Sequence, residues 1–201
     1  ECIQGIQTFK DFKKVKIADL VMLGAPVMKG RAVDRALQNK VCDLERAIGR
    51  LLPAHNALVL LHNFIATPKL LYTLHTSPCA GNPLLTKFDE TLRDGLCSIL
   101  NVKLTDDQWI QASLPVHNGG LGLRSACMLA PSAFLASAAA TLELQNEILP
   151  SRLRQLSDQC RGESLDIWSR AADVPEPACP ANNIQRVWAA VITSNTYSIV
   201  F

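Results

Sequence analysis

The chain has 201 residues, of which 48% are hydrophobic and 19% charged, so its composition excludes an intrinsically disordered protein and indicates a sizeable globular core. The seven cysteines lie at scattered positions without a C-x-x-C pair, which argues against a disulfide framework and a structural zinc site and favours the reducing interior of a cell, in the cytoplasm or nucleus. The net charge of +2 is too small to indicate a partner, but residues 1–50 carry ten basic against six acidic side chains, so any contact with a polyanion should favour this N-terminal quarter.

No segment of the sequence is expected to cross a membrane or to direct secretion. The longest apolar run, LVLLHNFIA, is shorter than the ~20 residues that a membrane helix needs. The N-terminus lacks the charged and then apolar pattern of a signal peptide. The chain starts with Glu1 instead of methionine, so we expect a fragment or a processed product.

The N-terminal residues carry the only pattern that indicates β structure. Residues 9–28 alternate loosely between polar and apolar side chains, and Gly24, Ala25 and Pro26 end the run. This pattern predicts one or two short strands. Their partner strands are expected upstream, which would leave an exposed sheet edge.

From Arg31 onward the hydrophobic period is that of a helix, and it continues to Leu52, where a proline follows. Apolar residues recur every three or four positions as one stripe: Val33, Leu37, Val41, Leu44, Ile48 and Leu51. A second apolar segment covers residues 54–66. Pro68 should interrupt it, and a helix should resume from Lys69 to Thr76.

Local signals mark the helices of the middle of the chain. Asn82 followed by Pro83 predicts a helix that runs to about Leu100. Thr105, with Gln108 three residues later, forms a capping box that opens a short helix.

The C-terminal third predicts further helices with weaker boundaries. Pro131 should restart a helix that runs to about Leu149. Weaker helices are predicted around residues 152–159, 164–172 and 184–192, and the stretch PEPACP at 175–180 is a predicted linker. The fold class predicted is mainly α, with a small β element at the N-terminus.

A glycine-rich stretch, SLPVHNGGLGLRSA at residues 113–126, raises the question of phosphate binding. It matches neither the dinucleotide fingerprint nor the P-loop, and it has no lysine that could reach a phosphate. We interpret Asn118, Gly119 and Gly120 as turn positions with positive φ, and Gly122 as a site of close packing.

No pattern typical of a catalytic centre emerges. Asp106 and Asp107 fall in the first turn of a predicted helix, where acidic side chains complement the helix dipole. His55 and His62 lie seven residues apart on one helical side, a spacing that packing explains. No cysteine or serine lies in a known nucleophile motif.

The basic side chains of the first long helix carry the most informative pattern. At about 100° per residue, they fall within about a quarter turn of one another, opposite the apolar stripe: Arg31, Arg35, Arg46 and Arg50. Such a row could follow a phosphate backbone. An ordinary solvated face is the alternative, because acidic residues share the helix.

Several stretches in a fixed order resemble one family. They are ADLVMLGAPV, RLLPAHNALVLLHNFIATPKLLYTLHTSPC, FDETLRDGLCSIL and TDDQWIQASLPVHNGGLGLRSACMLAPSAFLASAA. Together they are similar to the region after the palm in reverse transcriptases of non-LTR, LINE-like retrotransposons, where an "LG" strand precedes a "PKLLY"-like stretch and an "LP…GGLGI" stretch. The resemblance covers residues 1–149 well and the remainder more loosely.

The resemblance implies a domain division and a partner. Residues 1–28 would be the last palm strands, residues 29–149 a helical thumb-like domain, and residues 150–201 a helical C-terminal extension. A thumb closes on the RNA–DNA template–primer duplex beside the palm and fingers, and it contacts phosphates without reading sequence. The arginine row fits that role, and Lys69 in the PKLLY stretch is a second candidate.

The same resemblance implies that the chain alone is inactive. In this family the aspartates that bind Mg²⁺ lie on a palm strand and on an A-D-D hairpin upstream of the residues matched. No A-D-D occurs in the chain, so we expect no catalytic residue and no cofactor here. The alternative is a standalone helical protein-interaction module from a decayed element, which would dock through the Ala/Ser-rich residues 132–140 or the sparsely charged helix at 82–100.

Overall fold

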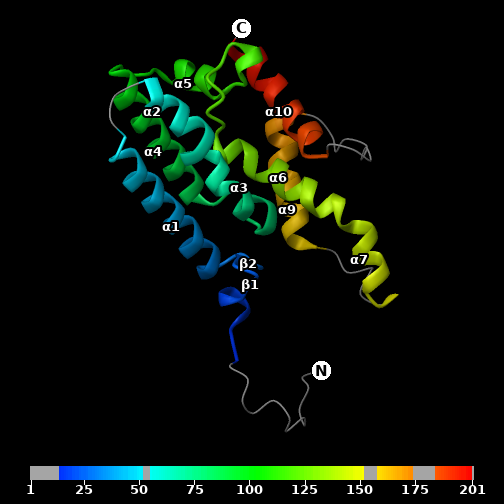
Figure 1. The fold of residues 1–201 in the computed structure, drawn as a ribbon. Coiled ribbons are helices and arrows are strands. Elements are labelled where there is room, and N and C mark those ends of the chain that lie inside the picture. Colours follow the sequence, from blue (N-terminus) through cyan, green and yellow to red (C-terminus); the bar gives the residue numbers. More distant parts are fainter. Residues whose placement is uncertain (1–13, 52–54, 152–157, 174–183, 201) are drawn as a thin grey trace.

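The computed structural model describes residues 14–51, 55–151, 158–173 and 184–200. These residues form a mainly α-helical fold with a small β-hairpin near the N-terminus, which confirms the predicted fold class. The helix α6 (Ala126–Ala140) lies in the middle and contacts α3 and α4 on one side and α9 and α10 on the other (Figure 1).

The β element is a hairpin of two very short strands. β1 (Val21–Met22) pairs antiparallel with β2 (Ala25–Pro26). Leu23 and Gly24 connect them with positive φ angles of 50° and 80°, the backbone that two-residue hairpin turns favour. The Tyr72 hydroxyl donates a hydrogen bond of 2.6 Å to the Leu23 carbonyl, which attaches the turn to the helical body.

The helices α1 (Arg31–Ile48) and α4 (Pro83–Leu100) pack through the apolar stripe that the sequence predicts. Four stripe residues are almost fully buried: Val33, Leu37, Val41 and Leu44. A Cβ on Gly95 would lie 2.6 Å from the Ile48 side chain, so this glycine allows the close approach. The end predicted at Leu52 is wrong, because the helix stops at Gly49, a residue of low helix propensity.

The predicted cap signals form as expected. Asn82 caps α4 by accepting a hydrogen bond of 2.9 Å from the Leu84 amide. Thr105 and Gln108 form the capping box of α5 (Asp106–Ser113). These starts depend on contacts between neighbours in the sequence, which is why the sequence shows them.

The second apolar segment folds as two helices joined by a π-helical turn. α2 (His55–Leu60) continues into η3 (Leu61–Ile65), and the Ala66 amide donates to the Leu61 carbonyl at 2.9 Å to close the wider turn. α3 (Thr67–Thr76) follows, with Pro68 in its first turn. An interruption occurs near the predicted place, but at Ala66, and the predicted restart at Lys69 is wrong because α3 already begins at Thr67. The first turn tolerates the proline, since an amide donor is not needed there.

The run Asn56–Thr76 is, among the described residues, the one helical stretch long and apolar enough to cross a membrane, and the bent pair of α6 and α7 would add a second. Such stretches are weak evidence for a membrane span, because core helices of soluble proteins share their composition. Here Leu61, Leu70 and Leu74 of this run are buried in the core of the fold.

The helix α6 is surrounded by other helices, and its small side chains let them approach closely. Its predicted start at Pro131 is wrong: the helix begins at Ala126, with Ser125 as its cap, and the proline lies inside it. Ser132, Ala133 and Ala136 are buried. The first half of the Ala/Ser-rich residues 132–140 is therefore covered by helices of this chain, whereas residues 137–139 are half-buried and Ala140 is exposed. Docking at this stretch stays a prediction.

A buried carboxylate on α4 holds the start of α6. Asp89 accepts hydrogen bonds from the Ser125 hydroxyl at 2.6 Å, the Ala126 amide at 2.7 Å and the Cys127 amide at 3.2 Å. These amides are donors that a helix N-terminus leaves without partners inside the helix. The carboxylate also faces the positive end of the α6 dipole.

Two C-terminal helices pack on the other side of α6. α9 (Gln159–Ala172) starts earlier than predicted, because Asp158 accepts hydrogen bonds from two amides of its first turn. α10 (Ile184–Val200) extends past the predicted end. The Trp168 and Trp188 rings pack edge to face with their centroids 4.8 Å apart. The Trp168 indole N–H donates a hydrogen bond of 3.1 Å to the Trp188 carbonyl.

The predicted domain boundaries stay predictions. The helices α9 and α10, which belong to the predicted C-terminal extension, pack against α6 of the predicted thumb-like domain. The short helix α7 (Leu142–Ile148) projects away from this body, and all its side chains are exposed (Figure 1). The linker predicted at 175–180 and most of the helix predicted at 152–159 lie outside the described residues.

We expect Asp89→Ala to lower the free energy of unfolding by about 2–4 kcal/mol, because it removes a cap and leaves buried donors without partners. Urea denaturation measures the effect. Asp94→Ala on the same helix is the matched control, since Asp94 is exposed and its loss should change stability by no more than ~0.5 kcal/mol. Equal effects would show that the buried carboxylate is not what holds α6.

The stability of the fold should also depend on pH through Asp89. Burial raises the pKa of this carboxyl above its ordinary value of 3.8, while the hydrogen bonds from Ser125, Ala126 and Cys127 lower it. A raised folded-state pKa means that the folded protein binds the proton more tightly than the unfolded chain. The stabilisation that Asp89 gains from binding this proton is therefore fully present below pH 3.8 and is lost as the pH rises through the folded-state pKa.

The measurement is the free energy of unfolding of the wild type minus that of Asp89→Asn, followed from acid to neutral pH. This difference should fall as the pH rises. A difference that grows with pH would show instead that the three hydrogen bonds to the carboxylate outweigh its burial.

Candidate nucleic-acid interface

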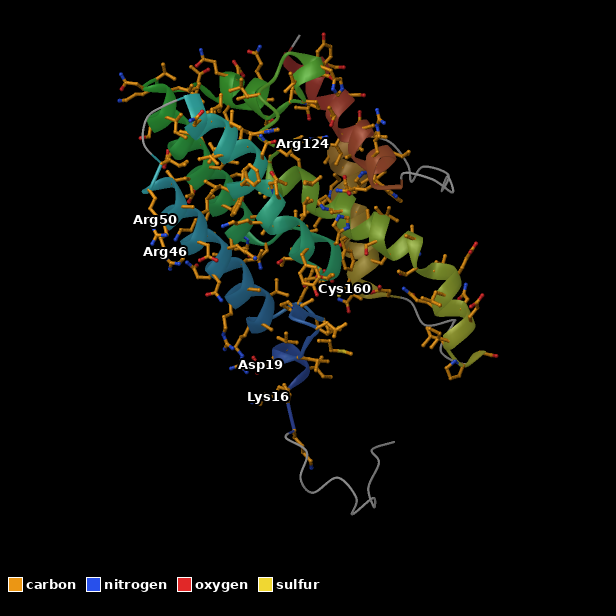
Figure 2. All side chains as sticks on the ribbon, in the orientation of Figure 1. Lys16, Asp19, Arg46, Arg50, Arg124 and Cys160 are labelled. Carbon is orange, nitrogen blue, oxygen red and sulfur yellow. The ribbon has the colours of Figure 1, made fainter. Side chains whose placement is uncertain are left out.

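The four arginines of the predicted row are all exposed along α1 and just beyond its end. Arg46 and Arg50 lie at the outer edge of the bundle (Figure 2). At 1.5 Å rise per residue, neighbours four apart lie about 6 Å apart along the axis, and Arg31 and Arg46 about 22 Å apart. The row thus consists of two pairs that could reach two separate stretches of a phosphate backbone.

Two of these arginines already have acidic partners. Arg31 forms an ion pair with Asp19 at 2.6 Å, and Arg46 forms one with Asp43 at 3.1 Å. Exposed ion pairs of this kind contribute roughly 0–1 kcal/mol, so a phosphate could replace the carboxylate. Among the described residues, Arg35 and Arg50 have no carboxylate partner. The surface is therefore less positive than the sequence pattern alone indicates.

The structure does not place Lys69 in this row. It lies in the first turn of α3, next to Pro68, and its side chain is exposed. The arginines and this lysine thus come from two helices. The predicted role of all five basic residues in nucleic-acid binding stays a prediction.

The glycine-rich stretch is a turn whose amides bond within the protein. Gly120 donates to the Pro115 carbonyl at 3.2 Å, Leu121 to Ala112 at 3.0 Å and Gly122 to Leu114 at 2.8 Å. These amides are not free to hold a phosphate, which supports the interpretation as a turn. The positive φ predicted for three residues occurs at Gly119, with 78°, but is wrong for Asn118 and Gly120.

Two of its glycines are required by close packing. A Cβ on Gly120 would lie 2.1 Å from the Leu114 carbonyl oxygen, and one on Gly122 would lie 2.6 Å from Nε2 of His62. Gly122 also has a φ of 73°. His62 therefore packs over the turn, and its Nδ1 lies 3.0 Å from Oδ1 of Asn63.

The same turn forms one wall of a groove that the sequence analysis did not predict. The groove has a volume of about 530 Å³ and lies between η3, the start of α3, the residues before α6 and the first turn of α10. Its polar lining comes from His62, Asn63, Thr67, Arg124, Gln185 and Arg186. No aspartate or glutamate is among the described residues that line it.

Arg124 is held at this groove from both sides. Its carbonyl accepts a hydrogen bond of 3.1 Å from the Thr67 hydroxyl on α3, and its guanidinium donates one of 3.2 Å to the Thr193 hydroxyl on α10. The side chain is half-buried, and burial lowers the pKa of the guanidinium. The only signal in the sequence was an arginine just after a glycine-rich turn, which is too common to indicate a site.

The remaining titratable groups form no reactive cluster in the described part of the chain. Burial raises the pKa of the Cys79 thiol to about 12 and that of Cys127 to about 11, so both stay protonated at neutral pH. Asp106 and Asp107 lie in the first turn of α5, and Asp106 accepts a hydrogen bond of 2.7 Å from Arg93. No three His, Cys, Asp or Glu side chains gather as metal ligands among the described residues.

We expect Gly120→Ala to destabilise the turn more than Gly119→Ala. The first places a Cβ against backbone atoms and forces a shift, with a cost of roughly 1–3 kcal/mol or more. The second meets no atom within 4 Å and bears only the strain of its φ of 78°, about 1–2 kcal/mol. Thermal unfolding of the two variants tests this order, and a reversed order would contradict the packing argument.

Comparison of the chain with protein-family models, with curated proteins and with solved structures finds no match.

Proposed function

We propose that this chain is the thumb portion of a non-LTR retrotransposon reverse transcriptase and that the exposed arginine face of α1 grips the template–primer duplex. The observation that carries the proposal is the solvent exposure of all four arginines, three along the 18-residue helix α1 and Arg50 two residues beyond its end. Such a row contacts phosphates and reads no sequence. In this proposal the polymerase chemistry belongs to the palm of the parent enzyme.

The hairpin supports an upstream partner in the same proposal. Its turn residue Leu23 is 96% exposed, and apolar side chains around it are also open to solvent: Val15, Ile17, Val21 and Met22. Exposed apolar side chains in one short segment are typical of an interaction site. Strands of the palm would cover this surface in the whole enzyme.

The second candidate function is a protein-interaction module, and α7 favours it. This helix has three exposed large apolar residues, Leu142, Leu144 and Ile148. A partner could dock there without nucleic acid. The two candidates differ in a simple observation: only the first requires a salt-sensitive affinity for nucleic acid that depends on the arginines.

We expect the chain to bind an RNA–DNA hybrid with an affinity that falls about 100-fold between about 50 and about 200 mM salt, if four phosphates are contacted. Arg35→Glu combined with Arg46→Glu should weaken binding and reduce the salt dependence by about two phosphate contacts. Fluorescence anisotropy with a labelled hybrid gives both quantities. The control is Lys87→Glu combined with Lys103→Glu, which changes the same charge at exposed positions outside α1.

A gain-of-binding variant sharpens this test. Asp43→Asn releases Arg46 from its ion pair and removes a negative charge from the helix, so affinity for the hybrid should rise a few-fold. The proposed contact of α1 with the duplex would be refuted by a hybrid affinity that does not change with salt concentration. It would also be refuted if the α1 variant and the control variant lower this affinity equally. An unchanged hybrid affinity in Asp43→Asn would remove Arg46 from the contact.

A further inference from the structure

The groove beside α3 contains a partly buried positive charge without a negative partner. The Arg124 guanidinium donates to the neutral Thr193 hydroxyl, and among the described residues no carboxylate forms an ion pair with it. Partial burial of a cation is unfavourable unless an opposite charge compensates it. Thr193 lies outside the lining of this groove, so the guanidinium lies where the groove meets α10. No other hydrogen bond of this side chain occurs among the described residues, and a guanidinium has four further N–H donors in a planar arrangement that suits phosphate oxygens.

A second cation lies at the same groove. Arg186 is exposed in the first turn of α10, and the N-terminal end of that 17-residue helix carries the positive end of its dipole. With two arginines, a helix N-terminus and no acidic side chain among the lining residues that the structure describes, the groove has the electrostatics of an anion site.

The rest of the lining is suited to a flat, partly apolar group. Pro68, Leu71, Pro115 and Val116 provide an apolar wall, and the side-chain amides of Asn63 and Gln185 provide both donors and acceptors. A volume of about 530 Å³ lies in the range of small-molecule sites. An anionic group joined to a heterocycle with polar edges matches this combination.

We propose that this groove binds one nucleotide unit, with its phosphate at Arg124 and Arg186 and its base against the wall formed by Pro68, Leu71 and Val116. The unit is either a free mononucleotide or one residue of a single strand. The site is built from elements other than α1, and Figure 2 shows Arg124 apart from Arg46 and Arg50. It therefore goes beyond the proposed grip on the duplex and does not depend on it.

The experiment is a calorimetric titration of the full chain with AMP, adenosine, inorganic phosphate and a five-residue oligoadenylate. We expect saturable binding of AMP, and weaker binding of adenosine and of phosphate, since each lacks half of the contacts. Arg186→Gln should lower the affinity for AMP at least about tenfold, which is the loss expected for one charge-assisted hydrogen bond. Arg186 is exposed, so this variant should fold, and Arg124→Gln provides the second test.

Two controls separate this site from the duplex grip. Lys87→Gln removes one exposed positive charge outside the groove, and the Arg35→Glu, Arg46→Glu variant changes α1, so both should keep the AMP affinity of the wild type. AMP affinity retained in the α1 variant, together with hybrid binding that is lost, would support both sites separately. If the oligoadenylate binds more tightly than AMP, the natural ligand is a single strand. If AMP binds more tightly, the natural ligand is a free nucleotide.

The proposal is overturned if AMP shows no saturable binding, or if Arg186→Gln and Lys87→Gln weaken it equally. If adenosine binds with the same affinity as AMP, the phosphate does not contribute to binding and the proposed phosphate site is wrong. If inorganic phosphate binds with the same affinity as AMP, the base does not contribute and the proposed base site is wrong.

Discussion

The fold depends on one buried carboxylate, because Asp89 on α4 supplies the acceptors for the first turn of α6. The helix α6 is in turn the element that α3, α4, α9 and α10 contact. Burial of an acidic side chain is unfavourable in isolation, and here three hydrogen bonds and a helix dipole offset it in part. Without that acceptor, the start of α6 would depend on the Ser125 hydroxyl, which accepts from the Met128 amide at 3.3 Å.

The position of α6 also determines what can lie at the surface near its start. Residues 115–124 must turn back so that Ser125 reaches Asp89, and Gly120 and Gly122 make this turn sterically allowed. The turn brings Arg124 between α3 and α10, where it bonds to Thr67 and Thr193. A glycine-rich segment that resembles a phosphate loop in composition therefore acts through the arginine that it positions, while its amides bond within the protein.

The two basic surfaces of the molecule differ in kind. The arginines of α1 are exposed and spread along about 28 Å of helix axis, an arrangement for contact with an extended polyanion. Arg124 is half-buried in a groove, where solvent screens its charge less and geometry constrains the ligand more. Sequence patterning finds the first kind, because residues on one helix face recur with the helical period. It does not find the second, because its residues come from three separate segments of the chain.

The sequence by itself determined the features that depend on near neighbours: the mainly α class, the buried stripe of α1, the cap at Asn82 and the capping box at Thr105. It also placed Arg31, Arg35 and Arg46 on the exposed face of α1, because helical geometry alone sets that face, whereas Arg50 lies beyond the end of the helix. Only the tertiary structure decided the start of α6, the coverage of its Ala/Ser face, the ion pairs of Arg31 and Arg46, and the groove around Arg124. Each of these joins residues far apart in the chain, and no local period or spacing encodes such contacts.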